Sequence, residues 1–457
     1  MSIAFGSIQS GLPQDIVQQI SAAEKIPLQQ MDIRKQKIEN KKSLINDLAS
    51  RLENVRGSVF NTKTARSLRE LSVTSSHEAL SATADKNVAE PANYQIEILQ
   101  MAQKSSAITN GVEDKDKTYL GVGYIRYKLP NGEKREVYVD EKNSSLSGIA
   151  RLINGDSENM MQATVIDSGD GSNTPWKLII SLDKTGDANK AEFPSIYLVD
   201  GDEDIWFEQT RDAQDAKIKL DGFEIEVPSN KASDLIPGVT LDLKKVAVGE
   251  EITLSIKEDT AKISDKVSDL VKNLNSVLAF IKEQNTLDDS VDTSQTLGGD
   301  ITLQTLESRI RAAFFSEIQT ESGPSRASEI GITFQKDGLI QLDQEKLRSA
   351  LESDYQKVSQ TLTGVYKKEG KVKGFIDNIE EVVNAATRKP GGILTTRRDS
   401  LDSQIRQIDR QIENKQRQIE KREEMLKAKF SRLEETISRI KTQGAGLAGF
   451  SGGGNPV

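Results

Sequence analysis

The chain has 457 residues, a formal net charge of −9, 29% charged and 5% aromatic residues, and no cysteine. That length allows about three domains, and the low aromatic content favours extended helices and modest β-domains over one large core. The acidic balance argues against nucleic acid as a partner, and the lack of cysteine excludes disulfides, thiolate metal sites and a cysteine nucleophile.

The first 27 residues are mostly small and polar. They contain no basic segment followed by an apolar one, so no cleavable secretory signal is visible. No apolar run in the chain approaches the ~18 residues that span a bilayer, so no membrane partner is expected. These facts alone suggest a cytoplasmic protein, unless export uses an uncleaved N-terminus. A short amphipathic helix over 13–24 would be marginal by itself.

A second helix is predicted over 28–60, with Pro27 suited to its first turn. Its apolar residues recur at three- and four-residue spacing. They are Leu28, Met31, Ile38, Ile45, Leu48, Leu52, Val55 and Val59. Lys35 and Lys41 or Lys42 interrupt this narrow seam, so the helix needs a partner helix to bury it.

From residue 70 the apolar residues alternate with period two, which predicts strands. Two such runs, 122–127 and 137–139, flank Pro130-Asn-Gly132 and predict a hairpin. Alternation continues through 162–166, 176–182, 195–199 and 214–258. We expect two antiparallel β-rich head domains here. The inner head would comprise 71–118 and 214–258, and the outer head, 119–213, would be inserted in it.

Helical spacing returns at residue 260 and predicts helices over about 263–281 and 303–314. The runs 332–334 and 339–342, split by Lys336-Asp337-Gly338, predict a second hairpin. Asp343 should cap the helix that follows. With 28–70, the segment 259–423 would form a helical leg domain. Residues 1–27 and 424–457 would be terminal segments, largely disordered when free.

A long helix is predicted over 393–443, where there is neither proline nor glycine. It carries a narrow apolar stripe with a polar gap at Lys415, Gln416, Arg422 and Glu423. The residues before the gap are Leu401, Ile405, Ile408 and Ile412. Those after it are Leu426, Phe430, Leu433, Ile437 and Ile440. We expect 393–412 to dock onto 28–60 and 424–443 to remain for a partner. The fold class is therefore α+β multidomain, with a coiled-coil or helical-bundle leg built from both termini.

Sequence motifs for catalysis, metal binding or phosphate binding are weak throughout the chain. His77 is the only histidine, and no nucleophile-elbow pattern accompanies it. Asp200, Asp202 and Asp204 have calcium-loop spacing, but Ile205 and Arg211 occupy critical positions of that loop. Residues 364–371 depart from the phosphate-loop pattern. We expect no catalytic, cofactor-binding or metal residues, and no enzyme activity.

Motifs along nearly the whole chain resemble the flagellar hook-associated protein 2 family, the filament caps. The opening Ser10-Gly11-Leu12-x-x-Asp15-Ile16-Val17 is similar to the family's N-terminus. So are the stretch Ile330-Gly-Ile-Thr-Phe-Gln-Lys-Asp-Gly338 and the strand motif from Leu220-Asp-Gly222 to Ile236-Pro-Gly238. The outer region, 119–213, matches only loosely.

The resemblance implies an extracellular cap at the flagellum tip, exported by the flagellar type III system without a cleaved signal peptide. It implies a ring-like homo-oligomer, a pentamer, that retains exported flagellin and promotes its folding and polymerisation. Flagellin, the hook–filament junction protein and an export chaperone would be its partners. No cofactor is implied.

A surface adhesin or glycan-binding protein is the alternative, acting through the outer β domain. An exposed Trp206-Phe207 pair would favour it. Core packing of small β-domains is the preferred interpretation of these aromatic residues. An enzyme would need a pocket with perturbed titratable groups, which no sequence feature demands.

Overall fold

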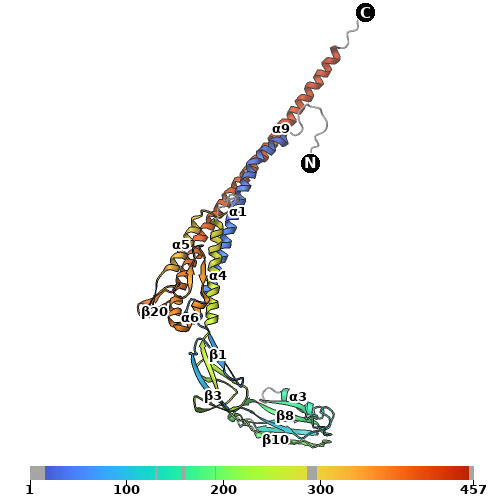
Figure 1. Cartoon of the computed structure of the whole chain (residues 1–457). Helices are drawn as coiled ribbons and strands as arrows, with labels where there is room; N and C mark the ends of the chain where they lie inside the picture. The colour runs from blue at the N-terminus through green and yellow to red at the C-terminus, as the bar shows by residue number, and fades with distance from the viewer. Residues whose placement is uncertain (1–15, 129–131, 156–159, 191, 286–295, 452–457) are drawn as a thin grey trace. The chain divides into compact units, whose positions relative to one another are not determined.

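The computed structural model describes residues 16–128, 132–155, 160–190, 192–285 and 296–451. These residues form two compact units (Figure 1). The helical unit contains the described residues up to Leu68 and those from Ile263 onward. The β unit is Arg69–Lys262. This α+β architecture, with helical ends and inserted antiparallel sheets, confirms the predicted fold class.

The helical unit is built around one apolar core that draws on most of its helices. The helices are α1 (Ile16–Phe60), α2 (Ala65–Leu68), α4 (Thr260–Asn285), α5 (Ile301–Phe315), α6 (Gln344–Ser353), α7 (Tyr355–Thr363), α8 (Phe375–Thr387) and α9 (Ile393–Ser451). On α4 the three–four repeat of Ile263, Val267, Leu270 and Leu274 is buried along its length. A broad apolar stripe of this kind belongs to a bundle helix and not to a two-helix seam.

Short hairpins connect the smaller helices. They pair β16 (Ile318–Thr320) with β17 (Gly323–Ser325), β18 (Ile332–Phe334) with β19 (Ile340–Leu342), and β20 (Val365–Lys367) with β21 (Gly370–Val372). The β18–β19 pair confirms the predicted hairpin, and Asp343 caps α6 by accepting the Lys346 N–H at 2.9 Å. The glycine-rich segment from Gly364 is thus a hairpin and not a phosphate loop.

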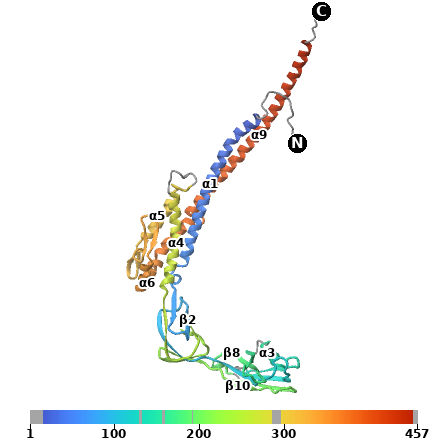
Figure 2. The same cartoon turned by 45° about the vertical axis from the view of Figure 1, so that its right-hand side comes forward.

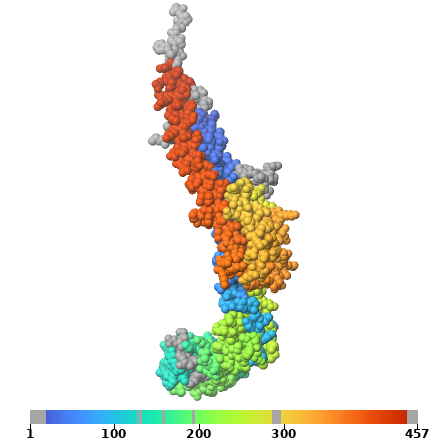
Figure 3. All heavy atoms as spheres, turned by 90° about the vertical axis from the view of Figure 1, so that its left-hand side faces the viewer, coloured from blue at the N-terminus to red at the C-terminus, as the bar shows by residue number. Residues whose placement is uncertain are grey.

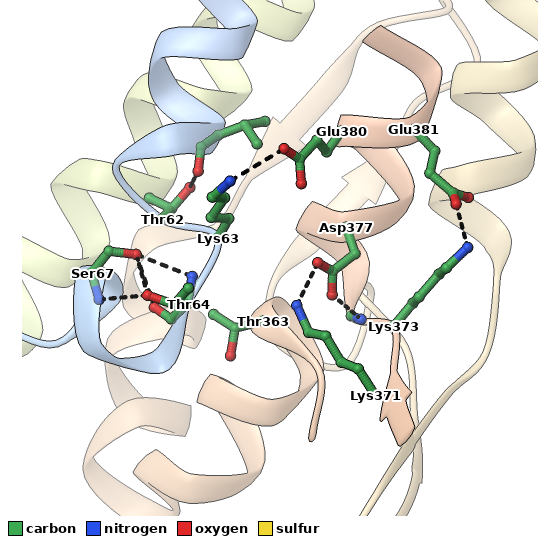
Figure 4. Close-up of polar contacts among 12 residues, drawn as sticks. Thr62, Lys63, Thr64, Ser67, Thr363, Lys371, Lys373, Asp377, Glu380 and Glu381 are labelled. Carbon is green, nitrogen blue, oxygen red and sulfur yellow. Dashed lines mark hydrogen bonds and ion pairs between the residues drawn. The ribbon is translucent and has the colours of Figure 1, made fainter. Parts of the chain in front are cut away.

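The segment that leaves α1 is fixed by its own side chains and by α8 (Figure 4). Thr64 and Ser67 exchange hydrogen bonds around the short helix α2, at 2.9–3.0 Å. Lys63 reaches Glu380 of α8 at 3.4 Å. At the start of α8, Asp377 accepts the Gly374 N–H at 2.9 Å and pairs with Lys371 at 2.6 Å. Of these contacts, the Lys63–Glu380 ion pair links the segment after α1 to α8.

Part of the β unit is built on two antiparallel sheets that share one core. One has the order β1-β15-β3-β11-β12, and the other β13-β14-β2. The strands are β1 (Leu71–Ser75), β2 (Leu80–Ala84), β3 (Ala92–Gln100), β11 (Ala216–Leu220), β12 (Phe223–Val227), β13 (Lys231–Ile236), β14 (Val239–Leu243) and β15 (Ala247–Glu258). Ile96 and Ile98 of β3 and Leu254 and Ile256 of β15 are among its buried residues, as period-two alternation requires.

A second core in the β unit lies between two further sheets and α3 (Leu146–Gly155). Their orders are β10-β4-β8-β7 and β6-β5-β9. The strands are β4 (Lys104–Thr109), β5 (Val122–Lys128), β6 (Lys134–Val139), β7 (Met161–Asp167), β8 (Trp176–Thr185), β9 (Glu192–Val199) and β10 (Phe207–Arg211). A single 3-10 turn, η2 (Asp187–Asn189), follows β8. The β5–β6 pairing confirms the predicted hairpin, although residues 129–131 of its turn lie outside the described residues.

The structure differs from the sequence expectations at three places. Helix α1 begins at Ile16 and runs through Pro27, whereas a new helix was expected from 28. Helix α9 continues to Ser451, whereas the terminal segment 424–457 was expected to be largely disordered when free. Strand β4, expected within the inner head, pairs with β8 and β10 of the outer sheet. Alternation shows that a segment is a strand but does not identify its neighbours, which explains the third difference.

Candidate functional site

The two long helices α1 and α9 lie side by side and run in opposite directions (Figures 1 and 2). Lys42 pairs with Asp402 at 2.5 Å and Lys35 with Asp409 at 2.7 Å. Moving seven residues back along α1 therefore corresponds to moving seven residues forward along α9. A seven-residue repeat on both partners is the geometry of an antiparallel coiled coil. We refer to this arrangement as the terminal helix pair.

The middle of the terminal helix pair is apolar. The predicted contact residues Ile38, Ile45, Leu48, Leu52, Leu401 and Ile408 are buried in the core of the helical unit. Met31, Ile405 and Ile412 are half-buried and pack against the same core. Leu28 is half-buried as well. The structure thus brings together the predicted residues that precede the polar gap of α9.

Charged residues fasten the distal end of the terminal helix pair. Arg422 lies 2.7 Å from Glu24, and Glu423 lies 3.5 Å from Lys25 and also accepts a hydrogen bond from Ser21. Because these contacts lie on the N-terminal side of Pro27, they hold that part of α1 against α9. They offer a physical reason why the helix persists through a proline, which removes one backbone hydrogen bond.

The polar gap of α9 is therefore filled by the partner helix. Ile419, within the gap, is only 3% exposed, and the charges of Arg422 and Glu423 that follow it meet opposite charges on α1. Sequence reasoning missed this contact, although a signal existed: the order Glu24-Lys25 is the charge complement of Arg422-Glu423. The seven-residue spacing of Lys35 and Lys42 against Asp402 and Asp409 was a second signal.

Beyond Glu423, α9 continues as a helix past the described part of α1 (Figure 3, red). The predicted residues Leu426, Phe430 and Ile437 are half-buried, while Leu433 is 44% exposed. Ile440 and Met425 are 62% and 59% exposed. The apolar residues of 426–440 follow a four–three repeat, which places them on one face of the helix. We call this face the distal stripe.

The proximal end of α9 is anchored through Arg397. Its guanidinium lies 2.9 Å from Asp300, whose side chain is 8% exposed and also accepts the Thr302 N–H at 3.0 Å as the N-cap of α5. Burial acts to raise the pKa of Asp300, but the hydrogen bonds from Thr302 and the Arg397 charge outweigh it and lower the pKa. Asp300 thus links the starts of two helices as a carboxylate.

The residues considered as catalytic or metal-binding candidates make ordinary structural contacts or lie in an exposed loop. His77 accepts the Ala79 N–H on Nδ1 at 3.1 Å, and its Nε2 lies 3.2 Å from Glu250. Asp200, Asp202 and Asp204 occupy an exposed loop after β9. Within the described ranges, no cluster of three or more histidine or carboxylate side chains is placed to hold a metal ion. A polar hollow of about 280 Å³ lies beside Glu307 and Arg311 on the helical unit.

None of the described helices combines the length and apolarity that crossing a membrane would need. The charged outer surface of the terminal helix pair and the end of α9 that extends past the described part of α1 make this pair the candidate functional site. Its chemistry is that of helix–helix association.

Comparison with known proteins identifies relatives over most of the chain. Residues 10–105 match the family described as flagellar hook-associated protein 2 N-terminus, and residues 213–442 match flagellar hook-associated protein 2 C-terminus. The B-type flagellar hook-associated protein 2 of Pseudomonas aeruginosa is 26% identical over 374 residues, covering 77% of this chain and 74% of that protein.

Two solved structures are also similar. The D1-D2-D3 domains of the flagellar cap protein FliD from Escherichia coli are 25% identical, with a TM-score of 0.59, covering 79% of this chain and 100% of that one. The flagellar cap protein FliD from Bdellovibrio bacteriovorus is 44% identical over 40% of this chain and 99% of that one, with a TM-score of 0.37.

Proposed function

The chain belongs to the flagellar hook-associated protein 2 family, the flagellar filament caps, and from this premise we propose how its parts serve that role. The distal stripe of α9 engages filament subunits at the tip, while the rest of the terminal helix pair stays folded within the subunit. In this way the cap retains exported flagellin and promotes its folding and polymerisation, so that the filament elongates.

One observation supports this proposal: helix α9 extends beyond the region in which it pairs with α1. Among the side chains that the structure describes, the ion pairs between α9 and α1 extend no further than Arg422 and Glu423, and the helix continues to Ser451 with Leu433 and Ile440 exposed. An amphipathic helix whose apolar face is only partly covered within the subunit suits docking into a groove between other helices. Flagellin would supply that groove.

The size of the distal stripe supports reversible attachment. Burying an exposed apolar side chain of this size contributes about 1.5–3 kcal/mol, so the five contribute at most roughly 8–15 kcal/mol in gross terms, because three of them are already half-buried. Association costs an estimated 4–15 kcal/mol in lost translational and rotational freedom. The net affinity per subunit is therefore modest. A cap that moves forward as each flagellin subunit is added needs contacts that form and break.

We further propose that the chain works as a ring-like homo-oligomer, a pentamer. Several weak attachments, one from each subunit, would then hold the cap while single attachments are exchanged. The hook–filament junction protein would be its first docking surface. An export chaperone and the flagellar type III system would deliver it to the outside without a cleaved signal peptide.

The domain division expected from the sequence remains part of this proposal, except that strand β4 joins the outer head: a leg of 28–70 and 259–423, an inner head of 71–118 and 214–258 without β4, and an outer head of 119–213. The family relationship gives no support to the adhesin alternative, although Trp206 is 54% exposed. We therefore do not propose a glycan-binding role.

The test is a truncation after Glu423, compared in a strain that lacks its own cap protein. We expect cells with residues 1–423 to secrete flagellin into the medium and to carry short filaments or none, as measured by electron microscopy. A matched chain of residues 1–443, which retains the distal stripe, should restore filaments. Purified 1–423 should lose only the helical signal of the deleted residues 424–451, and its melting curve should match that of the parent. Filaments of normal length with 1–423 would overturn the proposal.

A further inference from the structure

Helix α9 carries an apolar series that repeats every seven residues and continues through the polar gap. Its members are Ile405, Ile412, Ile419, Leu426, Leu433 and Ile440. Residues seven positions apart lie on the same face of a helix. The first two pack against the core of the helical unit, and the last three belong to the distal stripe. The buried seam and the distal stripe are therefore parts of one continuous face of α9.

Ile419 joins these two parts, and α1 covers it. The Ile419 side chain is 3% exposed. Glu24 faces Arg422, and the two helices run in opposite directions, so three residues back along α9 corresponds to three residues forward along α1. Ile419 therefore lies opposite Pro27, at the turn where α1 lacks a backbone hydrogen bond.

The part of α1 before Pro27, residues 16–26, covers the next member of the series as well. We call these residues the arm. By the same register Ile20 of the arm lies opposite Leu426, and both side chains are half-buried. The arm thus lies over the start of the distal stripe. The remainder of the stripe, with Leu433 and Ile440 exposed, extends past the described part of α1.

The arm is fastened mainly by polar contacts. They join Ser21, Glu24 and Lys25 to Arg422 and Glu423. The Lys25 and Arg422 side chains are 56% and 63% exposed, and ion pairs of exposed side chains add little to stability. Pro27 weakens the helix where the arm meets the rest of α1. The arm should therefore open at low cost, while the apolar seam beyond Pro27 stays closed.

We propose that the arm is a built-in cover for the docking face of α9, and that a helix of a filament subunit competes with it. While the arm is fastened, the docking helix reaches only the part of the distal stripe beyond Leu426. When the arm swings away at Pro27, the same helix extends over Leu426 and Ile419. This role rests on the proposed function and refines it: the arm gives way, while α1 from Leu28 onward stays paired with α9.

The unbroken series indicates which kind of helix fits and what the cover does. A partner helix with apolar residues every seven positions can follow this face across the polar gap, because the series does not break there. The partner must first displace the arm, so its apparent affinity is reduced by the fraction of chains in which the arm is open. The cover therefore keeps each attachment exchangeable as flagellin subunits are added.

The first measurement follows the cover without a partner. The chain has no cysteine, so Ile419→Cys gives the full chain a single site for a thiol reagent. Glu24→Arg places a like charge against Arg422 and should make this thiol react about two- to fivefold faster. Glu24→Arg with Arg422→Glu restores opposite charges and should restore the slow rate. Asp32→Arg, the same charge change at an exposed position beyond Pro27, should react as the parent does.

The second measurement is binding to filaments by full chains that keep Ile419. Capless filaments polymerised from purified flagellin are the probe, and co-sedimentation gives the affinity. If the docking helix and the arm compete, opening the arm raises the affinity and the thiol reaction rate by the same factor, because both follow the open fraction. Glu24→Arg should therefore bind about two- to fivefold more tightly. The double exchange and Asp32→Arg should bind as the parent does.

The two measurements together separate this inference from the proposed function. A parent that binds filaments, with no gain in Glu24→Arg, would overturn the inference and leave the proposed attachment standing. So would an unchanged thiol reaction rate in Glu24→Arg, since Ile419 would then not be covered by the arm. An equal gain in Asp32→Arg would also overturn it, because added positive charge would explain the binding. Absence of binding by every chain would overturn the proposed attachment and this inference together.

Discussion

Arg422 of α9 holds Glu24 of α1 at 2.7 Å between its Nε and the Glu24 carboxylate, across the distal end of the terminal helix pair. The contact lies on the N-terminal side of Pro27, where α1 has lost a backbone hydrogen bond, and beside the polar gap of α9. It therefore joins the weakest turn of one helix to the least apolar stretch of the other. It also marks the point beyond which α9 is left for a partner.

Reversing this contact should loosen the start of α1 without unfolding the unit. Glu24→Arg or Arg422→Glu alone should increase amide hydrogen exchange in residues 16–27 by about two- to fivefold. Exposed ion pairs contribute about 0.2–1 kcal/mol, and repulsion adds a similar amount. The double swap should restore protection. Arg417→Glu, which alters a pair within α9, is the control. Equal exchange in the single variants and the parent would show that the contact does not fasten α1.

The apolar seam should govern the stability of the helical unit. Leu48 is fully buried, so Leu48→Ala should lower the free energy of unfolding by about 2–5 kcal/mol. For a unit of this size that corresponds to a fall in Tm on the order of 10 °C, measured by circular dichroism at 222 nm. Ile33 is 53% exposed on the same helix, and Ile33→Ala should change the Tm by about 1–2 °C at most. A comparable loss in both variants would contradict the assigned seam.

The sequence was most informative where apolar spacing is regular. The long helices, the antiparallel character of the sheets and the hairpins around 129–131 and 335–339 could be predicted, because period and turn chemistry are local properties. The continuity of α1 through Pro27 could not, because the segment before Pro27 makes its ion pairs with residues some 400 positions away. Local propensity contains no information on such contacts.

Strand neighbours were also beyond local reasoning. In its sheet β3 lies between β15 and β11, both far along the chain, and β4 pairs with the strands of the second core. In the candidate site, the buried seam residues were found from spacing. The polar contacts of Ser21, Glu24 and Lys25 with Arg422 and Glu423 were missed. Exposed charges on a helix usually indicate a solvated face and not a contact.

Acid should destabilise the helical unit through Asp300. Its folded-state pKa is lowered: burial opposes the charge, but hydrogen bonds from Thr302 and the charge of Arg397 prevail. A lowered folded pKa gives stability that is present above the unfolded pKa, about 3.9, and is lost as pH falls through the folded value. Asp300→Asn should therefore lower the urea midpoint at pH 7, and the difference from the parent should shrink below about pH 4.

Circular dichroism at 222 nm measures this midpoint from pH 7 to pH 3. Asp269→Asn, on the exposed side of α4, is the matched control and should follow the parent at every pH. A constant difference between Asp300→Asn and the parent down to pH 3 would mean that the charge of Asp300 is not the stabilising feature.

Glu258 should give the β unit the opposite pH dependence. Burial raises its pKa and the nearby Glu90 adds to this, while Arg69 at 3.2 Å only partly offsets the increase. A raised folded pKa gives stability that is complete below the unfolded value, about 4.3, and is lost as pH rises through the folded value. In Glu258→Gln the side chain stays neutral, so the variant should match or exceed the parent at pH 7 and lack this pH dependence.

Tryptophan fluorescence reports this transition, because both tryptophans, Trp176 and Trp206, lie in the β unit. Asp242→Asn, on β14 of the same unit, controls for the loss of one negative charge. A Glu258→Gln variant that is clearly less stable than the parent at pH 7 would show that the ion pair with Arg69 outweighs the cost of burial.

The distal stripe should be dispensable for folding and required for capping. Leu433→Asp with Ile440→Asp changes side chains that are 44% and 62% exposed, so the Tm of the helical unit should move by about 2 °C or less. The same variant should yield short filaments and secreted flagellin in a strain without its own cap, because each buried aspartate would lack a partner in the docked state. Ser431→Asp with Thr442→Asp adds the same charge away from the stripe and should leave filament length unchanged. If both pairs of substitutions shorten the filaments equally, net charge and not the apolar stripe governs the attachment of α9.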